Sequence, residues 1–301
     1  MGRRFEIVDV FVDLSFGGNP LAVILDAQCL TSDDMQRIAR EFNFSESTFV
    51  LPASAADFDY QVRIFTPTQE VPFAGHPNIG TAFVLAEQAR RAGKEWPRSY
   101  RFDESAGSVN VTLTESDDGR LFAELKAPQA LSIGDRADVD LMAEVLGLDS
   151  AQIATSQHDP IVASVGLPFL IVALADRQAL ESVQVNPALL QRLVEQGLTP
   201  DIFCYTTTDQ PGVLRARVFA PMDGVPEDPA TGSANCALCG LLASLSGQDG
   251  EQQFVIHQGV EMKRPSLLKA RTLRQDGELK GVWIGGFCHP FASGILQDYC
   301  A

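Results

Sequence analysis

The sequence predicts an α+β protein of two similar domains, each a curved, mostly antiparallel sheet wrapped around a central helix. Three observations lead to this fold class: an internal repeat, the same order of elements in both halves, and an uncharged helical segment in a strand-rich chain. At 301 residues, the chain is long enough to build two hydrophobic cores.

The internal repeat is clearest between residues 62–72 ("VRIFTPTQEVP") and 216–226 ("ARVFAPMDGVP"), which align without a gap at an offset of 154. Five of the eleven positions are identical, whereas average composition gives roughly one match by chance. The same offset pairs Phe49 with Phe203. We therefore expect a duplication within the chain. Two generic α+β halves that share turn preferences are the alternative.

Each half follows the same order of predicted elements. A strand beginning near a Gly-x-Pro sequence precedes a short amphipathic helix, residues 32–42 in the first half and 186–197 in the second. Ser32 or Asp33 and Asn186 are the candidate N-caps of these helices. Two strands follow, the second ending in Phe-x-Pro, and then come a proline-rich turn and a helix of small residues.

The helices of small residues, 81–93 and 233–247, are the predicted central helices. The second has no charge over fifteen residues, so we expect it to be buried nearly all round. Residues 108–115 and 121–128 alternate between apolar and polar side chains, as half-buried antiparallel strands do. A buried helix among such strands indicates a sheet that wraps around it, once in each half, with a domain boundary near residues 125–135.

The composition is that of a globular protein, with 45% hydrophobic and 21% charged residues. A net charge of −16 argues against a nucleic-acid partner, because nucleic-acid phosphates would be repelled. The longest apolar run, residues 161–175, is interrupted by glycine and proline and is too short to span a membrane. The start of the chain lacks a signal-peptide pattern and the six cysteines are scattered, so we expect a cytoplasmic protein with reduced thiols.

Chemistry is expected at two glycine-bearing turns, residues 73–82 ("FAGHPNIGTA") and 227–237 ("EDPATGSANCA"), each directly before a predicted central helix. Unpaired N–H groups at a helix start attract anions, so two such turns facing one pocket between the halves suit a substrate carboxylate. Either turn alone is explained as well by a simple stop between strand and helix. Because one turn contains His76 and the other contains Asp228, we favour a functional role for the two turns together.

Two familiar kinds of site do not fit these residues. Gly75 and Gly80 have the spacing of a phosphate-binding loop, but Thr81 stands where that motif requires lysine. The four histidines show no H-x-x-x-H pattern, and Cys236-x-x-Cys239 has no second cysteine pair. No metal site is therefore predicted.

Glu46 is the candidate acid–base group. It stands between a helix end and a strand start, and the second half has Pro200 in its place. A carboxylate present in only one repeat suggests a role that the duplication does not require, and an exposed glutamate at a turn is the alternative. In a partly desolvated pocket the pKa of this carboxyl would rise, which suits proton transfer.

These stretches together resemble the phenazine-biosynthesis PhzF-like family, which has the diaminopimelate-epimerase-like fold. The matching segments follow the family's order over nearly the whole chain: residues 18–27, 35–52, 62–82, 227–235 and 282–286. With this resemblance we expect an N-terminal domain of residues 1–127, a C-terminal domain of residues 128–280, and a strand within residues 281–301 that returns to the first domain. The resemblance places the active site in the cleft between the domains.

The resemblance also implies an isomerase that moves a proton between carbon atoms of a small carboxylate-bearing metabolite, without metal or organic cofactor. Glu46 matches the family's proton-moving glutamate, while His76 and Asp228 match residues that hold or help to protonate the substrate. Four more residues fall where the family binds its substrate: Ser45, Gly75, Gly232 and Ser233. Isomerisation of trans-2,3-dihydro-3-hydroxyanthranilate is one candidate reaction, and a homodimer is the expected assembly.

One departure from the wider group of similar folds narrows the chemistry. Diaminopimelate epimerases and proline racemases have a cysteine in each of the two turns, whereas residues 74–76 and 228–230 contain none. A two-cysteine racemase is therefore disfavoured. The alternative from another functional class is a catalytically silent ligand-binding or protein-interaction protein, and the joint presence of Glu46, His76 and Asp228 counts against it.

Overall fold

The computed structural model describes residues 2–12 and 14–297 and divides the chain into two compact units. The first unit comprises the residues up to Lys126 together with those from Gly285 onward, and the second is Ala127–Ile284. Residues 298–301, at the end of the predicted returning strand, lie outside the described residues.

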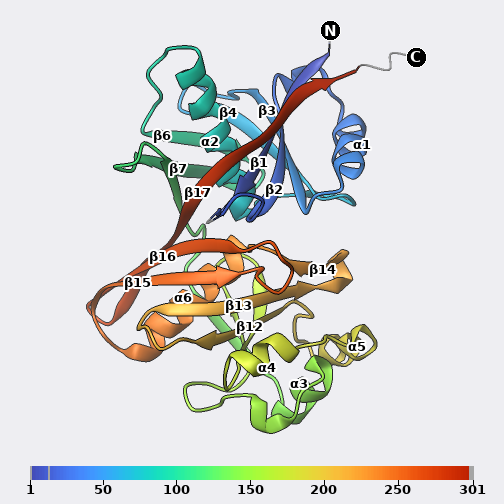
Figure 1. Ribbon diagram of the computed structural model, residues 1–301, viewed down its shortest axis with the longest axis vertical. Helices are drawn as coiled ribbons and strands as arrows, with labels where there is room; N and C mark the ends of the chain where they lie inside the picture. The colour runs from blue at the N-terminus through green and yellow to red at the C-terminus, as the bar shows by residue number, and fades with distance from the viewer. Residues whose placement is uncertain (1, 13, 298–301) are drawn as a thin grey trace. The chain divides into compact units, whose positions relative to one another are not determined.

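The sheet of the first unit closes into a barrel (Figure 1). Its strands pair in the order β1–β2–β3–β4–β6–β7–β8–β17, and β17 pairs with β1 to complete the ring. The β2–β3 and β4–β6 pairs are parallel, while the short β5 pairs only with β4. The strands are β1 (Arg3–Val10), β2 (Asn19–Ile24), β3 (Glu46–Pro52), β4 (Tyr60–Phe65), β5 (Glu70–Val71), β6 (Ser99–Glu104), β7 (Gly107–Glu115), β8 (Leu121–Lys126) and β17 (Glu278–Leu296).

Helix α2 (Gly75–Arg91) fills this barrel. Its residues from Gly75 to Ala86 are all buried, and it packs against β1, β2, β3, β7 and β8. A Cβ atom on Gly80 would lie 2.5 Å from Leu21 and 2.7 Å from Val10. Gly80 is therefore the residue that lets the helix approach β1 and β2 closely.

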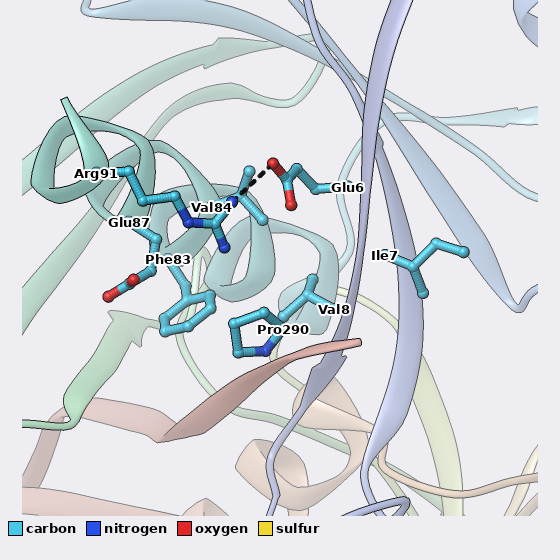
Figure 2. A pocket seen from close by; sticks show the side chains of 8 residues that line it. All are labelled: Glu6, Ile7, Val8, Phe83, Val84, Glu87, Arg91 and Pro290. Carbon is cyan, nitrogen blue, oxygen red and sulfur yellow. Dashed lines mark hydrogen bonds and ion pairs between the residues drawn. The ribbon is translucent and has the colours of Figure 1, made fainter. Parts of the chain in front are cut away.

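The C-terminal half of α2 is held against β1 by an ion pair. Arg91 Nη1 donates to Glu6 Oε1 at 3.0 Å, as Figure 2 shows. The side chains around this pair enclose a cavity of about 10 Å³, which has room for roughly one water molecule and none for a metabolite. Apolar side chains form much of its lining: Ile7, Val8, Phe83, Val84 and Pro290.

The second unit wraps a sheet around α6 (Gly232–Ser246), which packs against β10, β11, β15 and β16. The strand order is β9–β10–β11–β12–β13–β15–β16, with β14 paired to β13. The β11–β12 and β13–β15 pairs are parallel, at the same places as the two parallel pairs of the first unit. The strands are β9 (Ser132–Arg136), β10 (Ile161–Ser164), β11 (Pro168–Ala173), β12 (Ile202–Thr207), β13 (Val213–Ala220), β14 (Val225–Asp228), β15 (Gly250–Gln258) and β16 (Ser266–Gln275).

The remaining helices pack on the outside of the sheets. Helix α1 (Ser32–Phe42) lies against β3 and β4. Helices α3 (Val139–Leu146), α4 (Arg177–Ser182) and α5 (Pro187–Glu195) gather at one end of the second unit, where they share an apolar core with β11 and β12 (Figure 1). The predicted fold class, a sheet around a central helix in each half, is confirmed.

The predicted N-caps are confirmed in one half and wrong in the other. Asn186 Oδ1 accepts from Ala188 N at 3.1 Å and caps α5 as expected. Helix α1 is capped by Thr31, one residue before the predicted Ser32 or Asp33. Thr31 Oγ1 accepts from Asp34 N at 3.2 Å and Asp34 Oδ2 accepts from Thr31 N at 3.1 Å. This reciprocal capping box satisfies two N–H groups, one more than a single side-chain cap does.

The identical arginines of the repeat make the same contacts in both units. Arg63 forms a double hydrogen bond with Glu70, and its guanidinium lies 5.1 Å from the ring centre of Phe65. Arg217 forms a double hydrogen bond with Glu227 and lies 4.9 Å from the ring centre of Phe219. The arginines and the phenylalanines are 154 residues apart and the glutamates 157, so the two units make equivalent contacts, as a duplication predicts.

Candidate active site

Glu46 is the first residue of β3. Helix α1 ends at Phe42, its C-cap Asn43 has a left-handed φ of 53°, and β3 begins three residues after Asn43. Glu46 lies opposite Leu21 in the parallel pair with β2, and its side chain is 20% exposed. The sequence prediction of a carboxylate between a helix end and a strand start is correct, and Ser45 directly precedes it.

His76 is the second residue of α2, not part of a turn before it. The predicted helix start at residue 81 is wrong, because α2 begins at Gly75. Pro77 is compatible with helix here, since the first-turn N–H groups have no partner within the helix and proline lacks one. Gly75 and Gly80 both lie within the helix, so they form no phosphate-binding loop.

The structure brings Glu46 and His76 together. Glu46 Oε2 lies 3.5 Å from His76 Nδ1, and the imidazole is 4% exposed. Burial lowers the pKa of His76 to about 3, so the ring is neutral near pH 7. We assign the ring proton to Nδ1, which faces a carboxylate oxygen. This leaves Nε2 as an acceptor, and it has no hydrogen-bond partner among the described residues.

Two buried threonines tie the strand of Glu46 to the helix of His76. Thr48 Oγ1 on β3 and Thr81 Oγ1 on α2 share a hydrogen bond of 2.9 Å, and both residues are fully buried. Thr48 lies two residues after Glu46, while Thr81 lies in the second turn of the helix. The bond therefore fixes the position of α2 against β3, and with it the position of His76 relative to Glu46.

Asp228 belongs to a hydrogen-bonded turn in the second unit. It is the last residue of β14 and is 8% exposed. Its Oδ2 accepts from Thr231 Oγ1 at 2.5 Å. Gly232 and Ser233 are the first two residues of α6, whose N-cap Thr231 makes no side-chain cap. Asp228 is thus held one turn before the start of α6.

Sequence reasoning missed Gln258, which organises this turn. Its Nε2 donates to Asp228 O at 2.8 Å and to Thr231 Oγ1 at 3.2 Å. Its Oε1 accepts from Thr231 N at 3.2 Å and from Asn235 Nδ2 at 2.7 Å. Gln258 is fully buried at the end of β15. A search of the repeat for paired polar residues would have drawn attention to it, since Glu104 stands 154 residues earlier.

The predicted site residues thus fall into two groups. Ser45, Glu46, Gly75 and His76 meet at the start of β3 and α2 in the first unit. Asp228, Gly232 and Ser233 meet at the end of β14 and the start of α6 in the second. In neither α2 nor α6 does the side chain of the N-cap residue bond the first turn, which agrees with the expected affinity for an anion.

The described residues contain neither a cluster of metal-binding side chains nor a membrane-spanning helix. Among them, no three His, Cys, Asp or Glu side chains gather as a metal site would require. None of the helices they form is both long and apolar enough to cross a bilayer. That the site works without a metal stays a prediction.

Comparison with known proteins identifies relatives along the whole chain. A family model described as phenazine biosynthesis-like protein matches residues 8–294. An uncharacterized isomerase of Mesorhizobium japonicum is 35% identical over 303 residues, covering 98% of each chain. The trans-2,3-dihydro-3-hydroxyanthranilate isomerase of Pseudomonas chlororaphis is 33% identical over 297 residues, covering 98% of this chain and 99% of that protein.

Solved structures show the same fold. A Bacillus anthracis protein of the PhzF family superposes with a TM-score of 0.88 at 24% identity, over 99% of this chain and 100% of that one. A hydroxyproline epimerase from Agrobacterium vitis superposes with a TM-score of 0.61 at 16% identity, over 99% and 93% of the two chains. The predicted kinship with the epimerase-like fold is confirmed at the level of the fold.

Proposed function

Since the chain belongs to the phenazine biosynthesis-like (PhzF) family, whose full-length relatives described above are named isomerases, we propose that it moves a proton between two carbon atoms of a small carboxylate-bearing metabolite, with Glu46 as the acid–base group. The observation that carries this proposal is the contact of 3.5 Å between Glu46 and the buried, neutral His76.

Glu46 acts twice in the proposed reaction. Its carboxylate takes a proton from one carbon, the electron pair of that C–H bond moves through the adjacent double bond, and the carboxylic acid returns a proton to the second carbon. No electrons are gained or lost overall. Because the carboxyl group holds the proton between the two steps, the proposed reaction needs neither a metal nor an organic cofactor.

His76 orients the carboxylate and the substrate. Its Nδ1–H points to Glu46, and Nε2 is free to accept from a substrate N–H or O–H. A neutral ring suits this role, since a charged imidazolium beside Glu46 would hold the carboxylate in its ionised form and weaken it as a base. His76 is therefore assigned to binding and orientation.

Asp228 and the two helix starts complete the proposal. As the family resemblance implies, we assign Asp228 to the same substrate as Glu46 and His76, with Ser45, Gly75, Gly232 and Ser233 receiving the substrate carboxylate. The position of Gly75 and Gly232 at helix starts whose N-cap side chains make no cap bond supports that assignment. The substrate to test first is trans-2,3-dihydro-3-hydroxyanthranilate, for which the Pseudomonas relative is named.

The proposed setting is a cytoplasmic homodimer that binds no nucleic acid. The net charge of −16 supports the last point. Light scattering coupled to gel filtration measures the assembly. Dialysis against EDTA is expected to leave the turnover rate unchanged.

The test of function is proton exchange in D₂O. We expect the protein to introduce deuterium into carbon positions of the substrate, followed by NMR, and we expect Glu46→Gln to bind it without exchange. Glu41→Gln, which changes an exposed carboxylate on α1, is the matched control. Binding without exchange by the wild-type protein, for every carboxylic acid tried, would favour a silent ligand-binding protein instead.

A further inference from the structure

Glu104 is a buried carboxyl group that the proposed reaction does not use. It ends β6, is 7% exposed, and neither of its carboxyl oxygens has a hydrogen-bond partner among the described residues. The turn after Glu104 is hydrogen-bonded to the segment that precedes α2, because Ala106 N donates to Pro72 O at 3.1 Å. Such an isolated ionised carboxylate would be costly.

The neighbours of Glu104 favour its neutral form. Burial raises the pKa of Glu104 to about 8; the Asn78 amide beside it opposes this shift in part, and Asp103 on the same strand adds to it. In the antiparallel β6–β7 pair, Glu104 lies opposite Gly107, which is uncharged. Helix α2 presents the uncharged Asn78, and His76 on the same turn is neutral.

In the second unit, the neutral side chain of Gln258 occupies the position that corresponds to Glu104. Gln258 follows Glu104 by the repeat offset of 154 and ends β15, which pairs in parallel with β13 as β6 pairs with β4. Its Oε1 accepts from Asn235 Nδ2 and from Thr231 N, and its Nε2 donates to Asp228 O in the turn before α6. A protonated carboxyl has the shape of this amide, with one acceptor oxygen and one donor.

The partner asparagines are equivalent as well. Asn78 and Asn235 are the fourth residues of α2 and α6, and each Nδ2 donates to the carbonyl of the helix N-cap, Ala74 O at 3.0 Å and Thr231 O at 2.9 Å. Both side-chain oxygens, Asn78 Oδ1 and Asn235 Oδ1, are buried and have no hydrogen-bond partner among the described residues. In the second unit Asn235 Nδ2 also donates to Gln258 Oε1 at 2.7 Å, and a protonated Glu104 offers Asn78 Nδ2 the same kind of acceptor oxygen without a buried charge.

We propose that Glu104, in its protonated form, is a positioning residue: it holds Asn78 and thereby the first turn of α2, which carries His76 to Glu46. Gln258 does the same for the turn of Asp228. This inference rests on the proposed function for its effect on catalysis. Its effect on protonation and stability is independent of any reaction.

The proposal predicts a definite pH dependence. In the unfolded chain Glu104 ionises near 4.5, whereas in the folded protein it keeps its proton up to about pH 8. As the pH rises through this window the unfolded chain loses the proton first, so the wild-type protein becomes less stable. Glu104→Gln lacks this slope, because the amide does not ionise.

The test compares Glu104→Gln and Glu104→Ala with the wild type, with Glu41→Gln as control. In ¹³C-glutamate-labelled protein, one carboxyl signal should titrate near pH 8 and be absent from Glu104→Gln. Turnover by the wild type should fall about tenfold for each pH unit above 8, through kcat more than KM. Glu104→Gln should stay within twofold of its pH 7 rate, and Glu104→Ala should be slower at every pH.

Each outcome decides the proposal. A carboxyl that titrates near pH 4.5, or a Glu104→Gln protein as slow as Glu104→Ala, overturns it. If the wild type turns over no substrate, the proposed function fails. The carboxyl titration and the pH dependence of urea unfolding then still decide the role of Glu104. If Glu104→Ala does not fold, the comparison of Glu104→Gln with the wild type is sufficient.

Discussion

His76 shows how burial sets the chemistry of a single residue. Histidine normally changes charge near neutral pH, but this ring is 4% exposed and its pKa lies near 3. It is therefore a neutral hydrogen-bonding group beside Glu46 throughout the physiological range. The sequence identified the residue through its motif. The neutral state follows from twelve successive buried residues of α2, which no motif records.

The protonation of His76 is testable through stability. In the unfolded chain its pKa is about 6.5, and in the folded protein it is about 3. As the pH falls from 6.5 towards 3, the unfolded chain takes up a proton that the folded protein does not, so the wild type loses stability. His76→Asn should lack this loss. Urea unfolding at pH 7 and pH 5 measures it, and equal losses in both proteins would contradict the assignment.

The Thr48–Thr81 bond predicts a second residue-scale effect. Both hydroxyls are fully buried, so replacing one leaves the other unsatisfied, which costs about 1–3 kcal/mol. Thr48→Val and Thr81→Val should each lower the free energy of unfolding by this amount. The double variant should lose less than the sum of the two, as measured by chemical denaturation. Strict additivity would show that the bond does not form.

At the scale of the element, α2 explains why one prediction failed. Two glycines and a proline within residues 75–80 have low helix propensity, so the sequence predicted a turn there. Tertiary packing overrides that propensity, because Gly80 allows contact with Leu21 and Val10 and Pro77 lies in the first turn. The strands at residues 108–115 and 121–128 were predictable, since their alternating pattern is local.

Packing around α2 predicts the outcome of Gly80→Ala. Alanine favours a helix interior by about 1 kcal/mol, but its Cβ would lie 2.5 Å from Leu21 and force these side chains to shift. Overpacking of this kind costs about 1–3 kcal/mol, so we expect a net loss of stability in thermal unfolding. Gly240→Ala in α6 meets its neighbours at 3.3 Å and should lose less. A stabilised Gly80→Ala protein would contradict this packing.

At the scale of the whole molecule, the repeat made the architecture predictable. The offset of 154 holds for the Arg-x-Phe strands and for the pair of Glu104 and Gln258. The helix starts, Gly75 and Gly232, are 157 residues apart, because the connection before α6 is longer. The sequence could not show which polar and charged residues become buried. It therefore missed Glu104, Gln258 and the neutrality of His76.

The two arginines of the repeat should differ in their contribution to stability. Arg217 is 8% exposed, pairs with Glu227, and also donates to Leu180 O and Val183 O. Removing one partner of such a buried pair costs about 3–5 kcal/mol. Arg63 is more exposed and should contribute about 1 kcal/mol. Denaturation of Arg217→Met and Arg63→Met measures the difference, and equal losses would contradict it.

The central claim is that one carboxylate, Glu46, moves the proton. The most direct measurement uses a substrate that carries deuterium at the carbon losing its proton, in a single turnover in H₂O, with the product analysed by NMR. We predict that part of the deuterium appears at the second carbon, because the same carboxyl group takes and returns it, and that Glu46→Gln forms no product. Conversion by Glu46→Gln at the wild-type rate would contradict the account.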